Sequence, residues 1–139
     1  MRITPARRTA ARVFAALAIL AATGCGESAN LIGPDNQLEA TNATDQFQFQ
    51  LTALDEVSDS RTYDWENTGT QATIDISQAI TNGSAMLTIR DADGTVLYDS
   101  DIAEDNDGNT PVGTAGTWRI EVVLSETSGT FNFRVQKTT

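Results

Sequence analysis

The feature that most constrains this chain is an alternation of apolar and polar side chains, which begins at residue 45 and recurs to the C-terminus. A period of two puts every second side chain on one face of a β-strand, so each such run predicts a strand with one buried face. The seven runs have these apolar positions: Phe47, Phe49 and Leu51; Tyr63 and Trp65; Ala72, Ile74 and Ile76; Ala85, Leu87 and Ile89; Val96 with Tyr98 or Leu97; Trp118, Ile120, Val122 and Leu124; Phe131, Phe133 and Val135.

The segments between these runs carry residues that favour turns. They are Asn67-Thr68-Gly69, Asn82-Gly83, Asp93-Gly94, the stretch 113–116 and Ser128-Gly129. Each offers a residue that tolerates a positive φ angle, which is typical of tight connections between antiparallel strands. We therefore predict an all-β domain over residues 45–139, a single antiparallel β-sandwich or jelly roll of about seven strands.

The first 25 residues have a different character. Four of the nine basic residues, Arg2, Arg7, Arg8 and Arg12, precede an apolar run over 13–22, and small residues follow it. A basic segment, a short apolar segment and a small-residue end are typical of a secretory signal peptide. The apolar run is about half the length that a membrane-spanning helix needs.

The tetrad Ala22-Thr23-Gly24-Cys25 contains the only cysteine of the chain and resembles the lipobox of bacterial lipoproteins. That resemblance implies cleavage between Gly24 and Cys25, followed by acylation of the cysteine with diacylglycerol and palmitate-type chains that anchor it in a membrane. An ordinary secretory leader with an incidental Cys25 is the alternative. Gly26 stands where an Asp would imply inner-membrane retention, so the resemblance favours the outer membrane over the inner one.

These features divide the chain into three predicted parts. Residues 1–24 are the signal peptide, 25–44 are the lipidated cysteine with a flexible polar stalk, and 45–139 are the β domain. The domain would then lie in the periplasm or on the cell surface, attached to the bacterial envelope through its N-terminal lipid.

Two stretches of the predicted domain resemble the bacterial pre-peptidase C-terminal (PPC) family of β-sandwiches. They are residues 84–98, with the turn Asp91-Ala92-Asp93-Gly94, and residues 115–135, which begin with Ala115-Gly116 before an aromatic strand. Asp45-Gln46-Phe47 matches the opening strand of that family, with Asp64-Trp65 as a rival match. The resemblance implies an accessory, non-catalytic role, since members of the family are usually appended to secreted proteases.

An acidic segment lies between Arg90 and Arg119, with seven carboxylates and no basic residue. Crowded carboxylates repel one another unless a cation or water relieves them, and Ca²⁺ accepts six to eight oxygen ligands in adaptable geometry. The spacing fails the EF-hand template, so the candidate is a site built from loops, the alternative being a solvated acidic loop. The candidate Ca²⁺ ligands are Asp99, Asp101, Asp105 and Asp107.

The aromatic residues Tyr63, Trp65, Tyr98 and Trp118 suggest either core packing or a platform for stacking on sugars. Each is in phase with the apolar residues of its own run, which favours the core. Trp65 is the exception, because Asn67 ends its alternation at once. We therefore keep Trp65 as the candidate residue for binding a glycan or another partner.

The composition argues against two classes of function. The chain has no histidine, so the usual serine and cysteine nucleophiles lack a base, and we expect no enzyme. The net charge of −10 argues against nucleic acid as a partner. The sequence predicts a non-catalytic, lipid-anchored envelope module that binds a protein or a glycan, with Ca²⁺ as a candidate ligand. The alternatives are an acidic structural envelope lipoprotein without a specific ligand and, more remotely, a carboxylate-dependent hydrolase.

Overall fold

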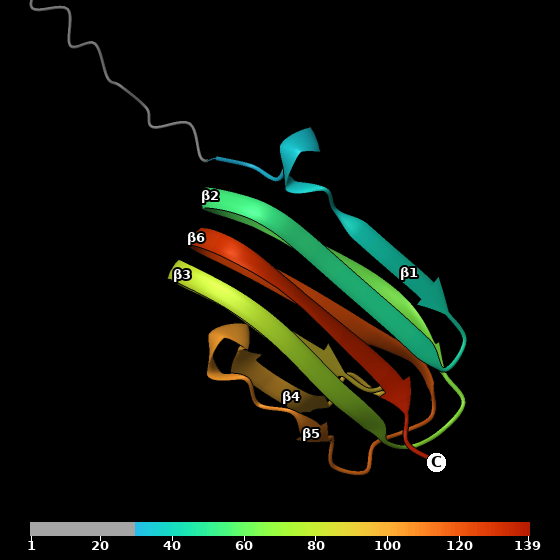
Figure 1. Cartoon of the computed structure of the whole chain (residues 1–139). Helices are drawn as coiled ribbons and strands as arrows, with labels where there is room; N and C mark the ends of the chain where they lie inside the picture. Colours follow the sequence, from blue (N-terminus) through green and yellow to red (C-terminus); the bar gives the residue numbers. More distant parts are fainter. Residues whose placement is uncertain (1–29) are drawn as a thin grey trace, which may run out of the picture.

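The computed structural model describes residues 30–139 and contains six strands in one antiparallel sheet. The strands are β1 (Glu39–Ala43), β2 (Gln46–Asn67), β3 (Ala72–Arg90), β4 (Val96–Asp101), β5 (Gly108–Asn109) and β6 (Gly116–Lys137). Two short 3-10 turns, η1 (Pro34–Asn36) and η2 (Ile102–Glu104), accompany them. The strand order is β1-β2-β6-β3-β4, with β5 paired to β3 (Figure 1). No helix within 30–139 is long and apolar enough to cross a membrane.

The prediction of an all-β, antiparallel fold is confirmed, but the number and length of the strands differ from the prediction. β2, β3 and β6 contain 22, 19 and 22 residues, and each includes two of the predicted runs. The sequence predicted about seven short strands in a sandwich, whereas the structure has one sheet with three long strands that bend together (Figure 1).

The bends occur where the register of the long strands shifts. The shifts lie between Leu51 and Asp59 in β2 and between Ile80 and Ser84 in β3. Gly83 and Gly129, which were predicted to reverse the chain, have φ angles of 71° and 124° inside β3 and β6. A glycine bulge uses the same positive φ as a tight turn. The glycines therefore marked positions of positive φ, but the chain bends there within a strand and does not reverse.

Bending brings the two halves of β2 face to face. The ring of Tyr63, in the second half, lies 5.1 Å from the ring of Phe47 and 5.8 Å from that of Phe49, both in the first half. The buried apolar side chains of both halves form one cluster. A single bent sheet therefore encloses the core that the alternating residues predicted.

The segment that was expected to be a flexible stalk is structured from Asn30 onward. It contains η1 and β1, and β1 pairs with β2 from Glu39↔Gln50 to Ala43↔Gln46. All five side chains of β1 are exposed, so the strand has no apolar face and leaves no alternation in the sequence. It is held by its backbone pairing with the first half of β2 and by side-chain hydrogen bonds to the second half.

Candidate functional site

The structure does not bring the four candidate Ca²⁺ ligands together into one site. Within residues 30–139, no group of three or more His, Cys, Asp or Glu side chains is placed to hold a metal ion. Asp99 lies on β4, where it accepts a hydrogen bond from the Thr88 hydroxyl at 2.9 Å. Asp101 caps η2 and accepts from the Ala103 N–H at 3.0 Å.

The other two carboxylates of that set also have structural partners. Asp107 accepts a hydrogen bond from the N–H of Ile76 at 2.6 Å, and Asp105 accepts from the side-chain amide of Gln78 at 3.3 Å. Both partners belong to β3. The acidic segment therefore fastens the connection between β4 and β5 onto the sheet, a role that no local spacing of carboxylates could reveal.

Trp65 is fully buried, so its predicted role in glycan stacking is wrong for this fold. Its ring packs edge-to-face against Trp118 with the centroids 5.7 Å apart, and its indole N–H donates to the Ala43 carbonyl at 3.0 Å. The alternation of β2 continues inward to Asn67, which is also fully buried and donates its side-chain amide to the Gln71 carbonyl. Because Asn67 is polar, the sequence pattern did not show that the strand continues to this residue.

Asp91 has a role that the sequence did not reveal. It is 5% exposed, and its carboxylate accepts hydrogen bonds from three backbone N–H groups, those of Asp93 at 3.0 Å, Thr95 at 2.8 Å and Thr114 at 2.9 Å. Burial by itself raises the pKa of the Asp91 carboxyl, but these donors together hold that pKa below its ordinary value. Asp91 thus joins the β3–β4 turn to the loop that precedes β6.

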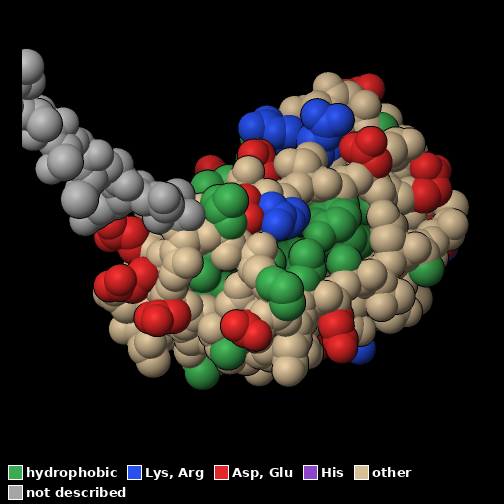
Figure 2. All heavy atoms as spheres, turned by 90° about the horizontal axis from the view of Figure 1, so that it is seen from above, with side chains coloured by type: hydrophobic (Ala, Val, Ile, Leu, Met, Phe, Trp, Pro, Cys, Tyr) green, Lys and Arg blue, Asp and Glu red, His purple; other side chains and the backbone are tan. Residues whose placement is uncertain are grey.

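One face of the molecule combines an apolar hollow with a few basic side chains. Figure 2 shows apolar side chains gathered in a central hollow, basic side chains along one side of it and acidic ones around the rim. This view looks down on the side where η1 and β1 lie in Figure 1. Partly exposed apolar side chains in this part of the chain are Ile32, Leu38 and Tyr63.

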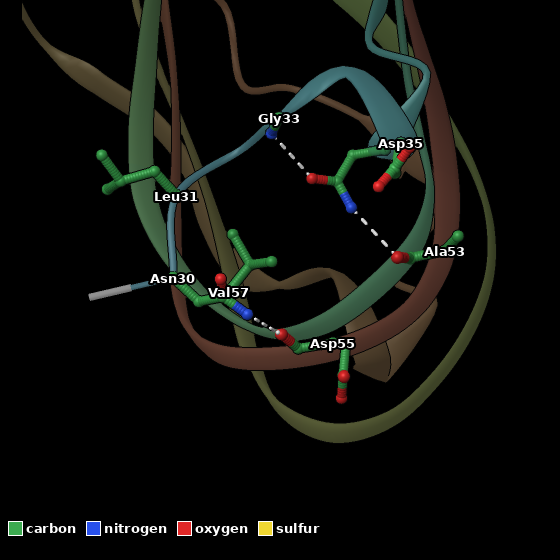
Figure 3. Close-up of a pocket in the computed structure, with 8 residues that line it drawn as sticks. Asn30, Leu31, Gly33, Asp35, Ala53, Asp55 and Val57 are labelled. Carbon is green, nitrogen blue, oxygen red and sulfur yellow. Dashed lines mark hydrogen bonds between the residues drawn. The ribbon is translucent and has the colours of Figure 1, made fainter. Parts of the chain in front are cut away.

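A second hollow, of about 250 Å³, lies where the segment before β1 meets the bulged part of β2 (Figure 3). Its two asparagine side chains are already bonded to the backbone around them. The Asn36 side chain accepts from the Gly33 N–H at 2.8 Å and donates to the Ala53 carbonyl at 3.0 Å, and the Asn30 amide donates to the Asp55 carbonyl at 2.7 Å. These hydrogen bonds make the hollow a junction between the two segments, while the exposed carboxylates of Asp35 and Asp55 line it without a hydrogen-bond partner among the described residues.

A third hollow, of about 270 Å³, contains Arg90 and Arg119, which lie directly opposite each other on β3 and β6. Asp64 also lines it and contacts Arg119 at 3.4 Å. Both side chains of this ion pair are about 60% exposed, so water screens their interaction and the pair contributes little. This hollow is open and carries both signs of charge.

The strand β1 lies at one edge of the sheet, and all five of its side chains are exposed. The N–H of Lys137 on β6 donates to the Asp45 carbonyl, so the odd-numbered residues of the adjoining part of β2 face β6 and the even-numbered ones face β1. Gln46, Gln48 and Gln50 are therefore bonded to Ala43, Thr41 and Glu39. The backbone groups of the two intervening residues of β1 point away from the sheet.

No protein-family model matches this chain, and no curated protein is similar to it at a significant level. The predicted cleavage and lipidation residues, Gly24 and Cys25, lie outside the described residues.

Proposed function

We propose that this chain is a lipid-anchored, non-catalytic all-β module of the bacterial cell envelope and that it binds a protein partner. The observation that carries the proposal is the leader, in which four arginines, a short apolar run and the tetrad ending in Cys25 follow one another in the order of a lipoprotein signal. Acylated Cys25 would hold the β domain at the outer membrane.

The polar chemistry of the domain supports a role other than catalysis. Within 30–139, every buried side-chain nitrogen and oxygen has a hydrogen-bond partner. The one lysine of the chain, Lys137, donates to Asp45 at 2.8 Å, and the chain has no histidine. These groups act as structural ties between segments. Of the hollows described above, the second is bridged by asparagine hydrogen bonds and the third holds the exposed Asp64–Arg119 pair.

The burial of Trp65 favours a protein over a glycan as the partner. Recognition of sugars commonly relies on exposed aromatic rings, and both tryptophans of this chain are fully buried. An exposed sheet edge, in contrast, presents backbone donors and acceptors that another strand can use. The β1 edge is therefore the surface that we assign to the partner.

The test is to produce the full chain in a bacterium with an outer membrane and to follow a labelled fatty acid. We expect the label and the protein in the membrane fraction, and we expect Cys25→Ser to lose both. Thr41→Ser, which keeps the leader intact, is the control. A wild-type chain that is exported without label would refute lipid anchoring.

A structural role in the envelope is the second candidate, favoured by the charge. Residues 30–139 contain all but one of the 19 acidic residues and five of the nine basic ones, and a strongly anionic domain would form a hydrated layer. That role needs no specific contact. Crosslinking in cells separates the two, since an interaction module gives discrete products through β1 and a coat protein gives none.

A further inference from the structure

The unprotected edge at β1 is unusual among the edges of this sheet. The second half of β2 is covered, because the Ser58 N–H donates to the Asn30 carbonyl at 2.8 Å and the Asn42 amide donates to the Asp64 carbonyl at 2.8 Å. β4 carries Asp99 and Asp101 within six residues, and charged side chains discourage pairing at an edge. β1 has one charge, Glu39, and contains no lysine, proline or bulge.

We propose that β1 pairs with β1 of a second copy of this chain, antiparallel and centred on Thr41. In this register the outward-facing residue Ala40 of each copy lies opposite Asn42 of the other. Each of these two pairs exchanges both backbone hydrogen bonds, which gives about four new bonds and uses every outward backbone group of the strand. The first half of the sheet then continues from one copy into the next.

The position of the single charge on β1 favours this register for pairing with a second copy. Glu39 of one copy lies opposite Ala43 of the other, so the two glutamates are separated by four residues along the strands, or about 13 Å. That distance exceeds the Debye length of about 10 Å at 0.1 M salt. A register centred on Glu39 would instead place two carboxylates directly opposite each other, which is destabilising. The strand is thus complementary to itself in one register.

The apolar surface beside β1 would also be covered. Ala40 and Asn42 lie opposite Phe49 and Phe47 of β2, so they share the inner face of the sheet. Leu38, which is 37% exposed, immediately precedes β1. A second copy would extend this inner face beyond β1.

This inference rests on one part of the proposed function, the anchoring of the chain to a membrane. A contact of five residues is weak between freely diffusing copies, whereas anchoring to one membrane raises the effective concentration of each copy near the other. The pairing itself depends only on β1. Lipid anchoring and pairing can therefore fail separately, and the experiment is designed to show which one does.

Disulfide formation tests the register directly. Residues 39, 41 and 43 would form non-hydrogen-bonded pairs with Cα atoms about 4.5 Å apart, which is within the range for a disulfide. We expect Thr41→Cys to give a covalent dimer at least about tenfold faster than Val112→Cys, a control at a loop residue that is 70% exposed. Glu39→Cys should react slowly by itself and rapidly when mixed with Ala43→Cys.

Each variant is examined in two ways. In the first, the full chain is studied in bacterial membranes, and the parent chain shows how much disulfide Cys25 forms by itself. In the second, the full chain with Cys25→Ser is studied in solution at high concentration. Ala40→Pro removes an outward N–H that β2 does not use, and it should abolish the Thr41→Cys dimer while the melting curve stays cooperative.

The two arms separate the possible failures. A Thr41→Cys dimer of the Cys25→Ser chain in concentrated solution supports pairing. If the chain that keeps Cys25 then fails to fractionate with membranes, pairing stands and anchoring is refuted. A membrane-bound chain whose Thr41→Cys variant reacts no faster than Val112→Cys overturns the inference. Protection of the Thr41→Cys thiol from alkylation without a homodimer overturns it too, because another protein would then occupy the edge.

Discussion

At the scale of single residues, this fold depends on carboxylates and amides that tie distant segments together. Asp91 accepts from Thr114, 23 positions later, and Lys137 donates to Asp45, 92 positions earlier. A side chain that accepts hydrogen bonds from distant backbone N–H groups stabilises the fold fully only when the rest of the structure holds those groups in place. The predicted calcium ligands Asp99, Asp101, Asp105 and Asp107 also accept hydrogen bonds from the rest of the fold, and the composition of the acidic segment does not reveal such partners.

The carboxylate of Asp91 tests this view. In Asp91→Asn, one oxygen becomes an NH₂ group that faces a backbone N–H, so a hydrogen bond is replaced by a contact between two donors. We expect the thermal midpoint to fall by about 5 °C or more. Asp99→Asn is the matched control, because Asp99 is exposed and accepts only from the Thr88 hydroxyl. Equal midpoints for the two variants would contradict the role assigned to Asp91.

The pairing of Asp45 predicts how the protein responds to acid. The hydrogen bond from Lys137, helped by the N–H and hydroxyl of Thr68, lowers the pKa of Asp45 from 3.8 to about 2. Because the folded state binds this proton more weakly than the unfolded state does, the stabilisation is complete above about pH 4 and is lost as the pH falls towards 2.

Lys137→Met should therefore raise the pKa of Asp45, as measured by carboxyl NMR titration, and flatten the loss of unfolding free energy between pH 4 and pH 2. Arg134→Gln removes a different exposed cation, which pairs with Asp75 at 2.8 Å, and serves as the control. If the acid limb of Lys137→Met had the wild-type slope, the assignment would be wrong.

At the scale of elements, bulges join the predicted runs into longer strands. Two runs lie in each of β2, β3 and β6, and the seventh forms β4. Each long strand holds two runs, and a local shift in register between them lets the strand bend without ending. Glycine marks both kinds of site. Gly94 lies in the β3–β4 turn with a φ angle of 84°, and Gly129 lies within β6 with a φ angle of 124°. Local sequence does not distinguish them, because both need a conformation that other residues rarely adopt.

The two glycines should nevertheless differ in how they tolerate a side chain. A Cβ at Gly129 would collide with the carbonyl oxygen of Ala79 on β3, whereas a Cβ at Gly94 would meet no atom within 4 Å. We expect Gly129→Ala to lower the free energy of unfolding by about 2–5 kcal/mol, from strain and overpacking together. Gly94→Ala should cost about 1–2 kcal/mol, from backbone strain alone. Chemical denaturation measures both, and a cost at position 94 equal to that at position 129 would argue against a bulge at Gly129.

At the scale of the whole molecule, one apolar core is enclosed by a sheet whose surface is strongly anionic. In the described part of the chain, four ion pairs engage Arg61, Arg119, Arg134 and Lys137, and most carboxylates lack a cationic partner. Unscreened charges of one sign repel each other more in the compact state than in the unfolded chain. The core must therefore hold the sheet closed against this repulsion.

Salt should consequently stabilise the protein. Raising NaCl from about 0.01 M to about 0.5 M shortens the Debye length from about 30 Å to a few ångströms, which screens repulsion between distant carboxylates. We expect the thermal midpoint at pH 7 to rise over this range. A titration with an uncharged osmolyte at matched osmolality separates screening from solvent exclusion. A midpoint that stayed constant or fell would show that attractive pairs outweigh the net charge.

The sequence by itself determined the all-β class, most of the residues that face the core, and some positions of positive φ, such as Gly83, Gly94 and Gly129. It did not indicate the positive φ of Ala53, Glu56 and Glu126. The features that it determined can be predicted because the alternation of apolar residues and the φ preference of each residue type are both visible in the local sequence. The same local character explains the prediction of the leader from its pattern alone.

Only the tertiary structure decided that Gly83 and Gly129 bend strands instead of ending them, that Trp65 is buried, and that the acidic segment does not gather into one site. It also decided that β1, which has no alternation, is a strand. Each of these outcomes depends on which distant segment of the chain lies beside the residue in the fold. Strand pairing joins residues that are far apart in the sequence, so the local sequence around either residue does not reveal its partner.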